Sequence, residues 1–270
     1  VRKGMKIMKK TTYLIIISII TIVCVIAGSI YHIGGFSIPG FSNKSDTKFT
    51  SIELDDGSVS ADTVNLGKFS DIDMDLQVMD VVIQRGDSLG ISYECSKKEY
   101  VPTIDVEDDV LTVKQKVKNK INIGNVKRCK MILTVSDDIA LENIEISTDV
   151  GDIKIDDVNG DAFTLESDVG DIKLTGITGE ELSINTDVGD VKLEEYSFDN
   201  AEISGHTGDV KVEGVDDLSK YTMDFETDLG DVKVNGKNYK KQYSEKASSG
   251  DSGKERSLTI RTNIGDIVVD

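Results

Sequence analysis

Apolar and polar residues alternate through most of the second half of the chain, and the alternation is organised around a recurring Gly-Asp pair. Each copy places apolar residues seven and five positions before the glycine, and again two and four positions after it. A period of two is the pattern of half-buried strands, so each copy predicts two short strands that meet at the glycine. The six glycines that lead the copies are Gly151, Gly170, Gly189, Gly208, Gly230 and Gly265.

The spacing of these glycines predicts a repeat architecture. The first four are 19 residues apart, and the last two gaps are 22 and 35 residues long. We predict an all-β fold, a repetitive β-solenoid (β-helix-like) with repeats of about 19 residues. Stacked antiparallel β-hairpins are the alternative, because Asp-x-Gly also suits a turn with a bulge. In both folds we expect the glycine to supply a positive φ.

The residue before the glycine favours the solenoid over the hairpins. An exposed hairpin tip would leave this side chain in water, whereas the inward corner of a parallel coil would bury it. We therefore expect the residues of this column to be buried. They are Val150, Val169, Val188, Leu229 and Ile264, with Thr207 in the remaining copy.

Charged residues follow the repeat as well. An aspartate directly follows each glycine, and a lysine stands two residues later in five of the six copies. Stacked aspartates would lie ~4.8 Å apart, and like charges that close are unfavourable. We expect the lysines to relieve this repulsion, which gives a solvated charge ladder. The lysines are Lys154, Lys173, Lys192, Lys211 and Lys233.

A second acidic column lies two positions before the glycine. His206 and Asn263 interrupt it. Carboxylates are hard oxygen ligands, so calcium is one interpretation of this column. However, the glycine-rich nonapeptide of calcium-binding β-rolls is missing, and aspartates near a turn also bond backbone amides. We expect no metal or cofactor, with calcium as the alternative. The column consists of Asp149, Asp168, Asp187 and Asp228.

The start of the chain predicts its location. Residues 1–10 are rich in lysine and arginine, and residues 11–33 form an uncharged, mostly apolar segment. That length suits one transmembrane helix, and the basic tail places the N-terminus in the cytoplasm. We therefore expect a single-pass protein of the cell membrane with an extracytoplasmic C-terminal domain. A cleaved signal peptide is the alternative.

The remaining chain divides into three parts. We expect a linker over 34–48, an irregular β-region with capping rungs over 49–141, and the repeat region over 142–270. Cys95 and Cys129 fall on apolar alternating positions of the irregular region. They are either buried free thiols or, if their strands are neighbours, a disulfide.

An insertion over 237–256 makes the last gap long. Its basic residues outnumber its acidic residues, so it forms a positive island on an acidic protein. Loops of this length are often functional or disordered. As a binding loop, its contact candidates are Tyr239, Lys240, Lys241 and Tyr243.

Charge and histidine content exclude several functions. The chain has 31 basic and 49 acidic residues, a net charge of −18. Nucleic-acid binding is therefore not expected, whereas cations and cationic peptides would be attracted. Only His32 and His206 are present, so neither a histidine-based triad nor a multi-histidine metal site can form. We expect no catalytic residues and no enzymatic activity, and the oligomeric state stays open.

Two segments carry a family resemblance. Thr-Asp-Val-Gly-Asp-Ile-Lys-Ile at 148–155 and Leu-Thr-Ile-Arg-Thr-Asn-Ile-Gly-Asp-Ile-Val-Val at 258–269, behind a lysine-rich start and one apolar segment, resemble the bacterial membrane-anchored putative-adhesin family of unknown function. Its members include LiaG-like envelope proteins of Gram-positive bacteria. The resemblance covers most of residues 49–270 and implies an envelope protein without an established activity. We expect a non-enzymatic cell-surface scaffold or putative adhesin. The alternative is a cell-envelope stress accessory that binds a membrane partner or cationic peptide.

Overall fold

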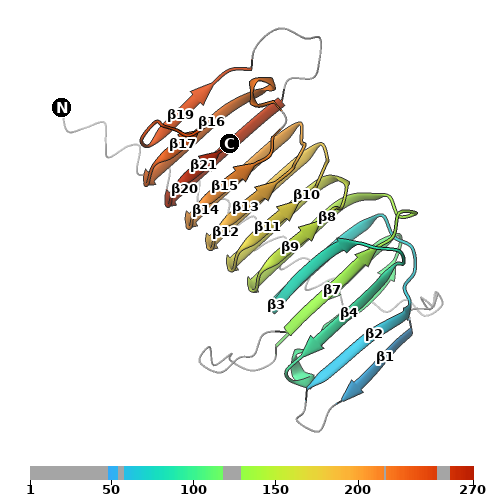
Figure 1. Ribbon diagram of the computed structural model, residues 1–270. Coiled ribbons are helices and arrows are strands. Elements are labelled where there is room, and N and C mark those ends of the chain that lie inside the picture. The colour runs from blue at the N-terminus through green and yellow to red at the C-terminus, as the bar shows by residue number, and fades with distance from the viewer. Residues whose placement is uncertain (1–47, 54–57, 118–128, 216, 248–255) are drawn as a thin grey trace, which may run out of the picture. The chain divides into compact units, whose positions relative to one another are not determined.

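The computed structural model describes residues 48–53, 58–117, 129–215, 217–247 and 256–270 (Figure 1). The expected basic tail, transmembrane helix over 11–33 and most of the linker lie outside these residues. Within the described ranges, no helix has the length and apolar character that a membrane crossing requires. The described chain is instead made of strands and two 3₁₀ helices, η1 (Lys98–Tyr100) and η2 (Leu218–Lys220).

The strands fall into four groups. The irregular region contributes β1 (Lys48–Glu53), β2 (Val59–Asn65), β3 (Asp71–Arg85), β4 (Gly90–Cys95), β5 (Thr103–Glu107), β6 (Val110–Lys114) and β7 (Cys129–Val135). The strands before each glycine are β8 (Leu141–Val150), β10 (Gly160–Val169), β12 (Glu181–Val188), β14 (Asn200–Thr207), β16 (Tyr221–Leu229) and β20 (Arg256–Ile264). The strands after it are β9 (Ile153–Asp156), β11 (Ile172–Thr175), β13 (Val191–Glu194), β15 (Val210–Glu213), β17 (Val232–Val234) and β21 (Ile267–Val269). The insertion adds β18 (Lys237–Asn238) and β19 (Gln242–Glu245).

The two strands of each copy lie in different sheets. The strands before the glycines pair in parallel with one another, as Leu165 with Ile184 shows, and form the long-strand sheet. The strands after the glycines do the same, as Leu174 with Leu193 shows, and form the short-strand sheet. Both registers advance by one repeat, so one copy makes one rung of a parallel coil. The predicted parallel stacking is confirmed, and the hairpin alternative is wrong, because the partners of a strand come from neighbouring copies.

Strand β3 joins the two sheets. Its first half pairs with β8 in the long-strand sheet, and its second half pairs with β9 in the short-strand sheet. Strands β7, β4, β2 and β1 then extend the short-strand sheet, and β6 and β5 extend the long-strand sheet. All strands therefore belong to one hydrogen-bonded system.

The order of the rungs in space differs from their order in the chain. Strand β20 lies between β14 and β16, because Ile260 pairs with Ile203 on one side and with Phe225 on the other. Strand β21 lies between β15 and β17 in the same way. The sixth copy is thus inserted between the fourth and the fifth (Figure 1). The fifth copy ends the stack, and β18 and β19 pair with its two strands.

The core fills the space between the sheets. The four apolar columns of the repeat point inward, and residues such as Leu165 and Leu174 are completely buried. Aromatic residues close the third, short side of the rungs, where the rings of Phe163 and Phe198 meet edge to face at 5.5 Å. Such pairs contribute about 0.5–1.5 kcal/mol beyond the area that they bury.

The corner at the glycines contradicts one prediction. The residues before the glycines were expected to be buried, but Val169, Val188, Ile264 and Leu229 are 46%, 49%, 48% and 62% exposed. The reason is that the glycine backbone takes the inner side of the corner. A Cβ on Gly170 would lie 2.0 Å from the carbonyl oxygen of Gly151, so backbone stacks directly on backbone and the preceding side chain turns outward.

Candidate functional site

The glycine and aspartate of each copy have structural roles at the corner. Each corner glycine after Gly151 lies against the backbone of the glycine on the neighbouring rung, and Gly151 lies against the backbone of Met79 on β3, which leaves no room for a side chain. The carboxylate of each aspartate accepts a hydrogen bond from the backbone N–H of the aspartate on the next rung. The N–H of Asp190 donates to Asp171 at 2.8 Å, for example, and the same contact links Asp152 to Asp80 on β3. This aspartate row satisfies backbone donors along the whole stack.

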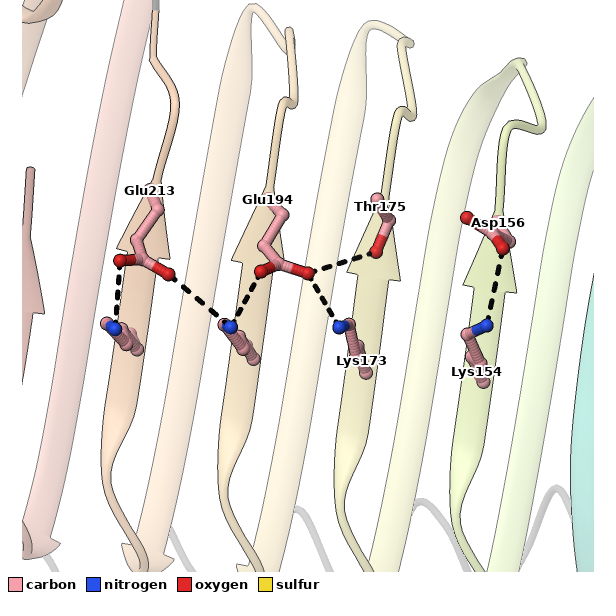
Figure 2. A network of polar contacts seen from close by, with 8 residues as sticks. Lys154, Asp156, Lys173, Thr175, Glu194 and Glu213 are labelled. Carbon is pink, nitrogen blue, oxygen red and sulfur yellow. Dashed lines mark hydrogen bonds and ion pairs between the residues drawn. The ribbon is translucent and has the colours of Figure 1, made fainter.

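The lysine column does not neutralise this aspartate row in the way that the sequence suggested. Figure 2 shows that the lysines point toward carboxylates two positions further along the strands. Glu194 accepts from both Lys173 and Lys192 at 2.6 Å. These hydrogen bonds hold the pKa of Glu194 well below its ordinary value, at about 2. Lys192 and Lys211 also contact Glu213, at 3.4 and 2.8 Å.

The outer face of the short-strand sheet is therefore a ladder of ion pairs. The expected relief of the aspartate row by lysine is seen at Lys233, whose Nζ lies 3.9 Å from Asp266. Backbone N–H groups of the next rung also donate to these carboxylates, as in the pairs Asp171–Asp152 and Asp209–Asp190. The sequence does not predict these lysine–carboxylate pairs, because a lysine side chain can reach a carboxylate on its own strand or on the next strand.

The outer face of the long-strand sheet has a different charge balance. Among its exposed and half-exposed carboxylates, five in the middle of the strands form what we call the acidic face, which consists of Glu145, Glu166, Glu202, Asp224 and Glu226. Arg261 lies among them and contacts Asp224 at 2.9 Å and Glu202 at 3.9 Å. A shallow hollow of ≈ 310 Å³ opens on this face, lined by small polar residues including Thr164, Ser183, Asn200, Ser257 and Thr259.

The second acidic column follows the edge of this face. Asp149, Asp168, Asp187 and Asp228 are all exposed. Partial burial and the charge of Asp168 raise the pKa of Asp149. His206 takes the place of an aspartate and lies 3.0 Å from Asp187. Among the described residues, no group of three or more His, Cys, Asp or Glu side chains could hold a metal ion. Calcium binding at this column stays a prediction.

The candidate binding loop is part of the cap. Strands β18 and β19 end the stack, and the ring of Tyr243 stacks on Phe225 with centroids 5.8 Å apart. Tyr239 packs against Tyr243 at 4.5 Å. The carbonyl of Lys240 accepts from the backbone of β17, and the Lys241 ammonium bonds the carbonyl of Asp228. The two tyrosines thus cover the last rung, and residues 248–255 of the insertion lie outside the described part.

An apolar ridge runs along the corner. Register places its members side by side on successive rungs, from Val150 on β8 to Leu229 on β16. The second acidic column lies before it in sequence and the aspartate row lies after it. The apolar ridge consists, in spatial order, of Val150, Val169, Val188, Thr207, Ile264 and Leu229. The sequence analysis identified this column but predicted that it is buried, so the exposure of the ridge was not predicted.

The fold is that of an all-β repeat protein. Its candidate functional surfaces, the acidic face and the apolar ridge, each extend over several rungs. The Toastrack DUF4097 family matches residues 69–269. The chain belongs to this family. The adhesin-like family of unknown function that the sequence suggested is thereby confirmed.

Solved structures of similar proteins come from several bacteria. One is a putative cell adhesion protein from Clostridium sporogenes, with 15% identity, a TM-score of 0.46, and coverage of 83% of this chain and 99% of that chain. Another is a putative adhesin from Bacteroides fragilis, with 14% identity, a TM-score of 0.42, and coverage of 86% and 100%. A search of curated proteins found no match. We draw no functional conclusion from these structures.

Proposed function

We propose that this protein is a non-enzymatic, membrane-anchored scaffold or adhesin that displays a β-solenoid outside the cell and binds cationic surfaces through its acidic face. The difference between the two outer faces carries the proposal. On the short-strand sheet, lysines and carboxylates alternate in ion pairs, so a partner would gain little by charge. On the long-strand sheet, carboxylates predominate. A surface of one sign attracts an oppositely charged partner and speeds its association.

The anchor in this proposal rests on residues 11–33 and the basic residues before them. A protein with this topology would carry its stack of rungs outside the cell. Parallel rungs with a shared core give a stiff support, because each rung bonds to both neighbours. Display of a charged face on such a support is a role that needs neither a catalytic group nor a cofactor.

Cells that display the full chain would test the acidic face. The measurement is the number of cells retained on amine-coated beads and on hydroxyl-coated beads of the same size. We expect retention on amine beads to fall about tenfold when Glu145, Glu166 and Glu202 become glutamine, and to fall with salt in the native protein. Retention on hydroxyl beads should stay low throughout.

The matched control neutralises three exposed carboxylates of the β3–β4 turn, β4 and η1, none of which belongs to the long-strand sheet, through Asp87→Asn, Glu94→Gln and Glu99→Gln. This control removes the same charge, so it should change retention by less than about twofold. Equal losses in both variants would show that only net charge matters, and would contradict a binding role for the acidic face.

A cell-envelope stress accessory is the second candidate, and the apolar ridge favours it, since a bare apolar row suits a protein or peptide partner. Replacing residues 11–33 by an unrelated membrane helix separates the two roles. An adhesin keeps its bead retention under this exchange. An accessory that contacts a membrane partner loses the crosslink to that partner.

A further inference from the structure

The apolar ridge is an unusual feature for a displayed surface. Four of its six members are large apolar side chains that are about half or more exposed. They form two neighbouring pairs, Val169 with Val188 and Ile264 with Leu229, and Thr207 stands on the rung between the pairs. Single exposed apolar residues are ordinary, but such residues gathered along one line mark an interaction site. The row is also not needed for the corner itself, because stacked glycine backbone fills the inner side there.

Carboxylates line both sides of this ridge. Asp168 precedes Val169 and Asp187 precedes Val188, and an aspartate follows the glycine on the other side in each rung. The pKa of Asp149 is raised mainly by partial burial and also by the charge of the neighbouring Asp168, so the carboxylates at this end of the column act on each other. The free energy of this arrangement would fall if cations lay beside the ridge.

This charge pattern excludes several occupants. A second copy of the chain would bring its own rows of carboxylates against these, which is repulsive. An anionic membrane surface would be repelled for the same reason. The occupant must therefore combine an apolar stripe with flanking positive charges.

The spacing of the ridge selects the conformation of that occupant. Strands in a sheet are ~4.8 Å apart, so six rungs present apolar side chains over about 24 Å. An α-helix brings a side chain to the same face about every 5.4 Å, and about 16 residues span 24 Å. In an extended strand, side chains on one face are ~6.8 Å apart. This spacing differs more from the ~4.8 Å spacing of the rungs than the helical spacing does.

We propose that the apolar ridge, with the aspartates on either side, binds an amphipathic cationic α-helix that lies across the rungs. The apolar stripe of the helix contacts Val169, Val188 and Ile264, and lysine or arginine residues on its flanks face the carboxylates. The proposal rests on the proposed function only in giving this acidic body a cationic partner, and it uses a different surface from the acidic face.

A designed peptide pair tests the proposal with the full chain in detergent. The probe is an 18-residue peptide of leucine and lysine with its leucines on one helical face, and the control peptide has the same composition in scrambled order. Binding is measured by fluorescence anisotropy of the labelled peptides. We expect the amphipathic peptide to bind at least ten times more tightly than the scrambled peptide, and to become helical when bound.

Two variants locate the binding surface. The ridge variant carries Val169→Ser and Val188→Ser, which remove exposed methyl groups and leave the core untouched, and it should bind the amphipathic peptide about tenfold more weakly. A control variant with Asp87→Asn, Glu94→Gln and Glu99→Gln, which keeps the ridge and removes three distant carboxylates, should bind it within about threefold of the native protein. Thermal unfolding of each variant checks that the fold is kept.

The outcomes separate this inference from the proposed function. Unchanged peptide binding by the ridge variant, or equal binding of both peptides, overturns the helix site and leaves the bead assay of the acidic face unaffected. A dimer of the native chain that the ridge variant cannot form would show that a second copy is the occupant, and would also overturn it. Loss of bead retention in the acidic-face variant, together with weaker peptide binding in the ridge variant and not in the control variant, supports both proposals.

Discussion

Cys95 and Cys129 lie opposite each other on β4 and β7, because the antiparallel register that pairs Glu94 with Lys130 places them next. Both are fully buried, and both thiols contact the Tyr100 carbonyl, at 3.4 and 3.8 Å. Residues facing each other on antiparallel strands have Cα atoms about 4.5–5.5 Å apart, which is within the range of a disulfide. The strands are therefore neighbours, the condition that the sequence left open, and the thiols are free in this structure.

We predict that these two cysteines form a disulfide when the protein is treated with a small disulfide oxidant. The oxidant takes two electrons, the two thiols lose two protons, and the intact mass falls by about 2 Da. The hydrogen bond between the two thiols raises the pKa of Cys95 and lowers the pKa of Cys129, so Cys129 should be the thiolate that attacks the oxidant, and the rate should rise with pH. Thiol titration after denaturation checks this, with Cys129→Ala as the control. Two titratable thiols at 95 and 129 after oxidation would contradict it.

The stacked corner glycines predict a severe effect of one methyl group. In Gly189→Ala the new Cβ would lie 2.0 Å from the carbonyl oxygen of Gly170, which is backbone and cannot move alone. We expect a loss of about 2–4 kcal/mol in the free energy of unfolding. Gly90→Ala is the matched control, because nothing lies within 4 Å of its added Cβ. Equal effects of the two substitutions in urea denaturation would refute the role of close packing.

The hydrogen bonds of the aspartate row predict that stability depends more on the side-chain oxygen acceptor of each aspartate than on its negative charge. Asp190 accepts the backbone N–H of Asp209 at 2.8 Å. Asp190→Ala removes this acceptor and should cost about 1 kcal/mol of stability. Asp190→Asn keeps a side-chain oxygen in place and should recover most of that loss. If the asparagine variant is as unstable as the alanine variant, the charge is what stabilises the corner.

The lysine–glutamate ladder predicts a stability that depends on pH. The pKa of Glu194 is lowered from its ordinary 4.5 to about 2 by hydrogen bonds from Lys173 and Lys192. A carboxylate with a depressed folded-state pKa stabilises the protein above its unfolded pKa, and this stabilisation is lost as the pH falls. We expect the melting temperature to drop between about pH 5 and pH 2, and to drop less in Glu194→Gln. Parallel pH profiles for both proteins would contradict the assignment.

Much of the fold could be predicted from the aliphatic columns, but the corner and the rung order could not. Leu165 and Leu174 are buried as their alternation predicts. Val169 is exposed because alternation ends where the chain bends, and backbone contact decides which side points inward. The position of β20 was beyond prediction, since Ile260 suits either neighbour and every copy has the same local pattern.

The candidate site was predicted only in its parts. The acidic columns were visible in the sequence, but the partners of the lysines depend on how far side chains reach between rungs. Tyr239 and Tyr243 were predicted as contact residues of a loop, and their place over Phe225 depends on how the insertion folds back onto β16. The spacing of residues in the sequence does not indicate that the insertion folds back onto β16.

The inserted position of β20 and β21 has a consequence for how the protein is made. The fifth copy emerges from the ribosome before the sixth, yet the rung that it must stack on is the sixth. Strands β16 and β17 therefore cannot form their native pairings with β20 and β21 until residues 256–270 have been synthesised. Folding of this chain thus includes a late step in which β20 and β21 join the fourth copy to the fifth copy and its cap.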